Sequence, residues 1–291
     1  MHFFFAFLLS LFFLSQSGCA IKEALFSPSE ADKNFQKTLK EEFNYEVVLK
    51  NTGETLWIYF PQEEAIYALK QSSSAEEPAK RRLSLLYLDG SFDDQIFSFE
   101  YDIVPTTKTT KAGGGLANSY TDQFNTIYLN LMNTIGRIYL NSAVPPKFLV
   151  LVIADIKSGF EIAWTIYLED FKKYQLGALP YEEYAVRILT DSKADAAITG
   201  DVSGNHLSYQ NIAWPDFLTK QALNRIRFKY QQSNSQPTMD SEKEIVKAFA
   251  QTIQSYGYND YQKIQLHDLR FDSRYEYNPS QVDQIAKDAE F

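Results

Sequence analysis

The clearest strand pattern in the chain is LVLVIADIKSGFEIAWTIYL, residues 149–168. Its first six residues are all apolar, which is typical of a central strand that is buried on both faces. The turn residues KSG at 157–159 lead into a segment where Phe, Ile, Trp and Ile alternate with other residues, the two-residue period of a strand. The sequence therefore predicts an antiparallel hairpin that forms the core of the second half of the chain.

Two more hairpins are expected before this one. Residues 45–60 contain two β-rich runs around the turn sequence NTGE, and Pro61 is expected to end the second run. Residues 83–104 are expected to turn at Asp89-Gly90 and return as a strand with one apolar face. The residues of that face are Phe97, Phe99, Tyr101 and Ile103.

Helices are predicted from caps and from apolar periodicity. Ser27-Pro28-Ser29-Glu30 has a capping Ser, Pro at the first helical position and Glu three residues after the cap, which predicts a helix to about Phe43. Residues 119–140 repeat apolar side chains every three or four positions, the pattern of a long amphipathic helix. These side chains are Tyr120, Phe124, Ile127, Leu131, Ile135 and Ile138. Further helices are expected over residues 180–191, 215–231 and 241–256 and after Pro279, with a strand over 263–271.

Strands thus occur in adjacent pairs and do not alternate with helices. This order predicts an α+β fold, with a largely antiparallel sheet built from consecutive hairpins and packed with amphipathic helices. Residues 106–118 combine Thr, Lys and three Gly, so they are expected to link a tether helix and β-hairpin region at 19–105 to an α+β region at 119–291. The two regions could also form one domain.

Residues 1–18 have the layout of a secretory signal peptide. An almost unbroken apolar run from Phe3 to Leu14 is followed by small and polar residues, and it is shorter than the roughly 20 residues that a membrane span needs. The sequence Ser17-Gly18-Cys19 resembles the lipobox of bacterial lipoproteins, although Gln16 stands where that family usually has Leu. The resemblance implies that Cys19 is acylated and becomes the first residue of the mature chain.

A plain signal peptidase site after Ala20 is the alternative, and it would give a soluble secreted or periplasmic protein. Cys19 is the only Cys in 291 residues, which favours lipidation because a single leftover thiol in an exported protein needs an explanation. Ala20 in place of Asp implies, by the same resemblance, sorting to the outer membrane where a cell has one. The expected localisation is therefore the cell envelope, with the protein held by lipid on Cys19.

Composition excludes some partners. The formal net charge of −9 lies in the chain after residue 18, which argues against nucleic acid and against a polybasic contact with membranes. The expected partners are membrane lipid, through acylated Cys19, and an envelope protein of unknown identity.

Motifs with a known mechanism are mostly absent from the sequence. It contains no H-E-x-x-H, no paired C-x-x-C, no G-x-S-x-G and no S-x-x-K, and we expect no cofactor. Gly113-Gly114-Gly115 is more consistent with a linker than with an anion site, because no Lys follows it. Residues 201–206 begin like a calcium loop, but Gly204 comes two positions early and Ile212 stands where a bidentate Glu belongs, so a surface turn is expected.

Three residues remain as candidates for catalysis. His206 could act as a general base beside Asp201 or Ser203, although a single loop His is usually solvated. Asp155 and Glu161, at the ends of neighbouring strands, could do acid and base work on a glycoside if they lay within about 10 Å of each other. The simpler interpretation is that Asp155 starts a turn and Glu161 faces water. Trp57, Trp164 and Trp214 could stack on sugars or peptides, but packing in the core explains them more simply.

Two functions follow from these observations. The first is an exported envelope lipoprotein with a non-catalytic binding, structural or assembly role. The second is a membrane-tethered hydrolase that acts on cell-wall glycan or peptide through Asp155, Glu161 or His206.

Overall fold

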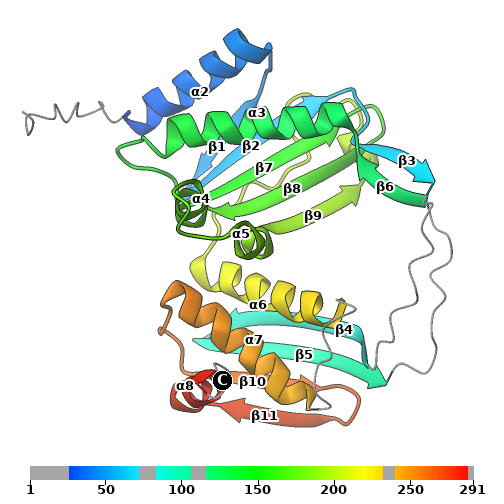
Figure 1. The fold of residues 1–291 in the computed structure, drawn as a ribbon, viewed down its shortest axis with the longest axis vertical. Helices are drawn as coiled ribbons and strands as arrows, with labels where there is room; N and C mark the ends of the chain where they lie inside the picture. Colours follow the sequence, from blue (N-terminus) through cyan, green and yellow to red (C-terminus); the bar gives the residue numbers. More distant parts are fainter. Residues whose placement is uncertain (1–25, 72–82, 106–115, 232–239, 288–291) are drawn as a thin grey trace, which may run out of the picture.

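The structure is a computed structural model that describes residues 26–71, 83–105, 116–231 and 240–287 (Figure 1). Within these ranges the chain has an α+β fold with three sheets, and most neighbouring strands are antiparallel. Two pairs, β2 with β7 and β5 with β10, are parallel. The fold class expected from the sequence is thus confirmed, with parallel pairing as an addition that consecutive hairpins alone did not indicate.

The larger sheet has the strand order β1-β2-β7-β8-β9. Its strands are β1 (Val48–Thr52), β2 (Thr55–Gln62), β7 (Phe148–Asp155), β8 (Phe160–Tyr167) and β9 (Leu189–Ala194). The central strand β7 is buried at all eight positions, as its continuous apolar sequence predicts. Both expected hairpins, β1–β2 and β7–β8, are confirmed.

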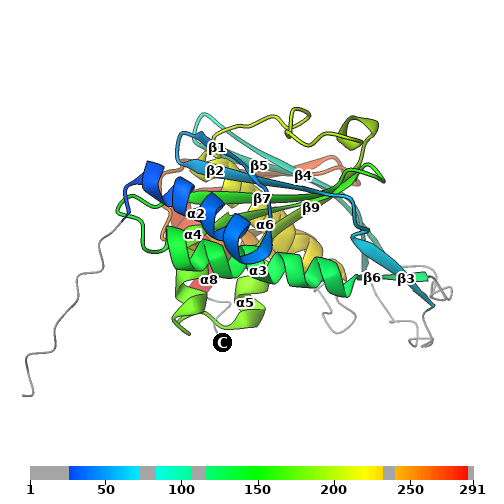
Figure 2. The ribbon, with the colours of Figure 1, turned by 90° about the horizontal axis from the view of Figure 1, so that it is seen from above.

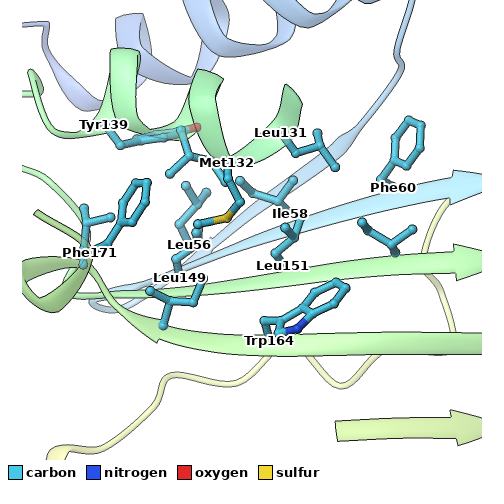
Figure 3. Close-up of a cluster of buried hydrophobic side chains, with 14 of the residues drawn as sticks. Leu56, Ile58, Phe60, Leu131, Met132, Tyr139, Leu149, Leu151, Trp164 and Phe171 are labelled. Atoms are coloured by element: carbon cyan, nitrogen blue, oxygen red, sulfur yellow. The ribbon is translucent and has the colours of Figure 1, made fainter. Parts of the chain in front are cut away.

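Helices α2 (Pro28–Phe43) and α3 (Asp122–Tyr139) cover one face of this sheet. The predicted capping box of Ser27 and Glu30 is present at the start of α2, and Thr121 caps α3. The apolar stripe of α3 packs on alternate residues of β2, β7 and β8 (Figure 3). Among the side chains of this layer are Leu56, Ile58, Leu131, Met132, Leu149, Leu151 and Trp164.

The smaller sheet has the order β11-β10-β5-β4. It consists of β4 (Leu83–Asp93), β5 (Ile96–Pro105), β10 (Lys263–Asp268) and β11 (Ser273–Tyr277). Three helices pack with it, α6 (Trp214–Gln231), α7 (Ser241–Tyr256) and α8 (Pro279–Lys287). The predicted apolar face of β5 is confirmed, because Phe97, Phe99, Tyr101 and Ile103 are all buried. Asp240 and Gly257 begin and end α7 as expected.

Both sheets combine strands from either side of residues 106–118, since β2 pairs with β7 and β5 pairs with β10. Residues 106–115 lie outside the described residues, and Leu116 begins β6 (Leu116–Tyr120), which pairs with β3 (Tyr67–Gln71). A partly buried ionic network also links α4 (Leu168–Gln175) and α5 (Tyr181–Arg187) to α6. Arg187 contacts Asp170 at 2.9 Å and Glu183 at 2.7 Å, and Arg225 of α6 contacts the same Glu183.

Three expectations about local structure were wrong. Pro61 does not end the second strand of the first hairpin, because β2 continues through Pro61 to Gln62 and both residues pair with β7. The second hairpin turns at Asp94-Gln95, both with positive φ, and Gly90 lies within β4. A β-carbon at Gly90 would lie 2.8 Å from the Phe99 ring, so this glycine makes room for the ring and forms no turn. The helix expected over residues 180–191 ends at Arg187, because Leu189 and the residues after it pair with β8 as strand β9.

Candidate functional site

The face of the larger sheet opposite α2 and α3 is covered by the segment 195–213, which connects β9 to α6 (Figure 2). This segment contains one short 3-10 helix, Ala196–Ile198. It contributes few apolar side chains. The buried apolar residues there are Tyr59, Val150, Val152, Ala154 and Ile198, and those partly buried against them are Val48, Trp57, Ile156, Ala163, Leu207 and Ile212.

Hydrogen bonds to β2 attach the segment to the sheet along its length. The Tyr59 hydroxyl donates to the Asp201 carbonyl at 2.5 Å, and the Trp57 indole donates to the Gln210 carbonyl at 2.9 Å. Farther along, the Ile212 backbone N–H donates to the Thr55 hydroxyl. The side chains of β2 that point away from the helices therefore act as the partners of the segment.

At the centre of this contact, the His206 ring lies between two carboxylates. Its Nδ1 is 2.6 Å from Oδ2 of Asp201 and its Nε2 is 2.7 Å from Oε2 of Glu161. The side chains of His206, Glu161 and Asp201 are 3%, 5% and 9% exposed, so all three are shielded from water. Lys193 of β9 approaches the other oxygen of Glu161 at 3.3 Å. We call these four residues the Glu161–His206 cluster.

The Asp201 carboxylate also organises the turn that presents His206. It accepts hydrogen bonds from the backbone N–H groups of Ser203 and His206, each at 3.0 Å. Burial by itself would raise the pKa of Asp201, but the hydrogen bonds from His206 and Ser203 hold that pKa below its usual range. Gly204 lies in this turn with φ of +69°, and a β-carbon there would collide with the Tyr209 hydroxyl. The resemblance to a calcium loop is thus explained by an aspartate that binds its own loop.

This arrangement limits the chemistry of His206. A neutral imidazole has one N–H, so the ring can donate to both carboxylates only as an imidazolium. Two buried carboxylates and one imidazolium would together carry one net negative charge, and the half-exposed Lys193 ammonium lies where it offsets that charge. Both ring nitrogens are occupied by protein oxygens, so a substrate could reach His206 only if one of these contacts opened.

Asp155 does not join this cluster through any contact of the described residues. Its Oδ1 accepts from the backbone N–H groups of Lys157 and Ser158, and its Oδ2 accepts from the Ser158 hydroxyl at 2.6 Å. Asp155 therefore starts the β7–β8 turn, as the simpler interpretation expected. The expectation that Glu161 faces water was wrong, because Glu161 is 4% exposed beneath segment 195–213.

The sequence alone did not indicate that Tyr59 binds segment 195–213 or that Lys193 contacts Glu161. A signal for Tyr59 exists in β2, whose residues LWIYF at 56–60 are apolar or aromatic on both phases of the strand. Such a strand must be covered on both faces, and α2 and α3 cover only one. The cover of the second face comes from residues about 140 positions later, which no local pattern reveals.

Within the described ranges, no group of three or more His, Cys, Asp and Glu side chains is arranged to hold a metal ion. In the same ranges, no helix has both the length and the apolar character needed to cross a bilayer. No known protein family, curated protein or solved structure matches the chain. Function is therefore inferred from the residues of the chain itself.

Proposed function

We propose that this protein is an exported lipoprotein of the cell envelope, anchored by acyl chains on Cys19, with a non-catalytic binding, structural or assembly role. The observation that carries this proposal is the signal-peptide layout that ends at the lipobox-like Ser17-Gly18-Cys19, which holds the only Cys of the chain. The fold begins a short distance after Cys19. Phe26 already bonds to the fold, because its N–H donates to the Asn141 carbonyl and its carbonyl accepts from the Ala143 N–H.

Cys19 and Phe26 are seven residues apart. Even fully extended, this stretch spans only about 25 Å, at roughly 3.6 Å per residue. An acylated Cys19 would therefore keep the start of α2 close to the surface of the membrane. The short reach is consistent with a domain that works at the bilayer and does not extend far from it.

Acyl chains are the kind of anchor that the charge of the chain requires. With a net charge of −9, the protein would be repelled by anionic lipid headgroups, so surface electrostatics would not hold it. More than one acyl chain is needed for stable attachment, because a single chain of myristoyl length binds only marginally. A diacylated or triacylated Cys19 meets that requirement.

A non-catalytic role is favoured over a tethered hydrolase by the bonding of the candidate residues. The Asp155 carboxylate accepts hydrogen bonds from its own turn. The His206 ring contacts Asp201 and Glu161, and Glu161 also contacts Lys193. We therefore assign the Glu161–His206 cluster to holding segment 195–213 on the sheet. Hydrolysis of cell-wall glycan or peptide that is lost in His206→Ala but not in a comparably destabilised variant would support the hydrolase instead.

The test of the anchor is fractionation with mass spectrometry of the mature N-terminus. Wild type is expected in the membrane fraction with acyl groups on Cys19, and Cys19→Ser is expected to lose them and the attachment. Ala20→Asp is the matched control, because it keeps Cys19 and should move the protein to the inner membrane of a two-membrane cell. An unmodified N-terminus at Ile21 in a soluble wild-type protein would defeat the proposal.

A further inference from the structure

The loop between α3 and β7, residues 140–147, lies beside the first described residue of the chain. The Phe26 N–H donates to the Asn141 carbonyl, and the Phe26 carbonyl accepts from the Ala143 N–H at 2.8 Å. Figure 1 shows this loop and the start of α2 at one end of the molecule, with β3 and β6 at the other. Because Cys19 is only seven residues before Phe26, an anchor on Cys19 would act on this end.

The tip of this loop is apolar and exposed. Ala143, Val144 and Pro145 are three successive exposed residues whose side chains have no charge and no hydrogen-bonding group. Val144 is 66% exposed. Apolar side chains of this kind gain free energy from a surface that removes them from water. The tip is therefore suited to contact with another apolar surface.

The backbone of the loop is suited to lipid as well. A backbone N–H without a partner is costly to place in hydrocarbon. The N–H groups of four loop residues already donate to backbone carbonyls, namely those of Asn141, Ser142, Ala143 and Lys147. Pro145 and Pro146 have no N–H. Within residues 141–147, this leaves only the Val144 N–H without a hydrogen bond to another described residue.

The loop itself carries no charge, since residues 138–146 contain no charged side chain. At its two borders the charges are paired. Arg137 contacts Glu42 at 2.8 Å, and Lys147 contacts Glu54 at 3.4 Å. The loop and these two pairs therefore add no net charge that lipid headgroups would repel, although the whole chain carries −9.

We propose that Ala143, Val144 and Pro145 lie against the lipid bilayer and enter its interfacial layer, so that the domain rests on the membrane by this end. The inference rests on the proposed anchor and deepens it by naming the surface that the anchor brings to the lipid. Strands β2 and β7 then run away from the membrane, because both begin beside this loop.

A folded partner protein is a poorer occupant of this surface than the bilayer. The stretch from Cys19 to Phe26 spans at most about 25 Å, whereas a small domain is about 30 Å across. A partner of that size would not fit between the loop and the membrane that holds Cys19. The short stretch of chain thus favours lipid as the direct contact of the loop.

The test places a fluorescent nitrobenzoxadiazole label on Val144→Cys in the acylated protein, bound to phosphatidylcholine vesicles. The label reacts with one thiol, because Cys19 is the only natural Cys and its thiol is acylated. Nitroxides attached to the lipid chains should quench this label. Val202→Cys is the matched control and should be quenched several-fold less. Val202 is 61% exposed and lies near the opposite end of β7, where the Gly200 N–H donates to the Ile156 carbonyl.

Both labelled variants should melt at the temperature of wild type, because both side chains are exposed. Equal quenching at residues 144 and 202 of the acylated protein, or no quenching at residue 144, would overturn the inference and leave the anchor standing.

A second sample separates the two proposals. Cys19→Ser with a hexahistidine segment in place of residues 1–18, held on nickel-chelating lipid, keeps a short tether without acyl groups. If mass spectrometry finds wild type unacylated and this form still shows the stronger quenching at residue 144, the anchor alone is contradicted. If wild type is unacylated and this form shows no such difference, both proposals are contradicted.

Discussion

The two faces of the five-stranded sheet are covered in different ways. On one face, α2 and α3 contribute continuous apolar stripes, and the layer between helices and sheet is built almost entirely from apolar side chains. On the other face, segment 195–213 has one 3-10 turn and three apolar side chains in the layer, and polar groups of the sheet complete the contact. The Glu161–His206 cluster lies only on this second face.

The difference shows how one face of a sheet can be covered without a helix. A helix satisfies its own backbone hydrogen bonds, so it needs from the sheet only an apolar surface. An irregular segment must find partners for its backbone groups, and here Tyr59, Trp57 and Thr55 provide them. Stability on the helix face should therefore depend on apolar burial, and stability on the segment face on hydrogen bonds and charges.

The largest effect is expected on the helix face. Ile127→Asp places an unpaired carboxylate in the apolar layer, where Ile127 is 4% exposed, and should lower the free energy of unfolding by about 4 kcal/mol or more. Asn125→Asp, on the exposed side of the same helix, should change it by less than about 0.5 kcal/mol. Denaturant melts measure both, and equal effects would contradict the assignment of the buried stripe.

Removal of the histidine should have the largest effect on the segment face. His206→Leu leaves Asp201 and Glu161 buried without the ring between them and should cost about 3–5 kcal/mol. The double variant with Glu161→Leu should lose less than the sum of the two single losses, because it removes a carboxylate that would otherwise remain buried with one partner fewer.

The matched control for this prediction is His267→Leu. His267 lies on β10 beside Glu100 and Asp272, which are both exposed, so the midpoint of the denaturant melt should hardly change. If the losses in free energy of unfolding from His206→Leu and Glu161→Leu simply add in the double variant, the two side chains do not stabilise the fold through their mutual contact.

Acid should open the segment face before the helix face. The folded-state pKa of Asp201 lies below its ordinary value of 3.8, so its carboxylate stabilises the fold above that value and the contribution is lost as pH falls through the lowered pKa. Hydrogen exchange of residues 198–213 should therefore accelerate at a higher pH than exchange in α3. Asp201→Asn should produce the same difference at neutral pH, and equal protection of both regions would contradict it.

The smallest effect is expected for one hydrogen bond. Tyr59→Phe removes the hydroxyl that donates to the Asp201 carbonyl and keeps the ring in the layer, so it should cost about 1 kcal/mol. Ile58→Thr, on the helix side of the same strand, places a hydroxyl among apolar groups where Ile58 is fully buried and should be at least as damaging. A thermal melt in which Tyr59→Phe is the more damaging change would reverse the comparison between the two faces.

Local signals in the sequence determined most of the elements. The apolar run at 149–154 predicted the buried central strand, the spacing of Phe124, Ile127 and Leu131 predicted α3, and the capping box at Ser27 predicted the start of α2. These features depend on residues that are near one another in the chain, so their periodicity and caps are visible in the sequence alone. The sequence also indicated Glu161 and His206 as candidate functional residues.

The way in which these elements combine depends on contacts that form only in the folded chain. The parallel pairing of β2 with β7, the conversion of residues 189–194 into β9, and the contact of Glu161 with His206 all join residues that are far apart in the chain. For Glu161, the alternation of β8 correctly separated two faces but could not say that segment 195–213 covers the second. That cover depends on long-range burial and hydrogen bonding, which have no period in the sequence and exist only once the sheet has formed.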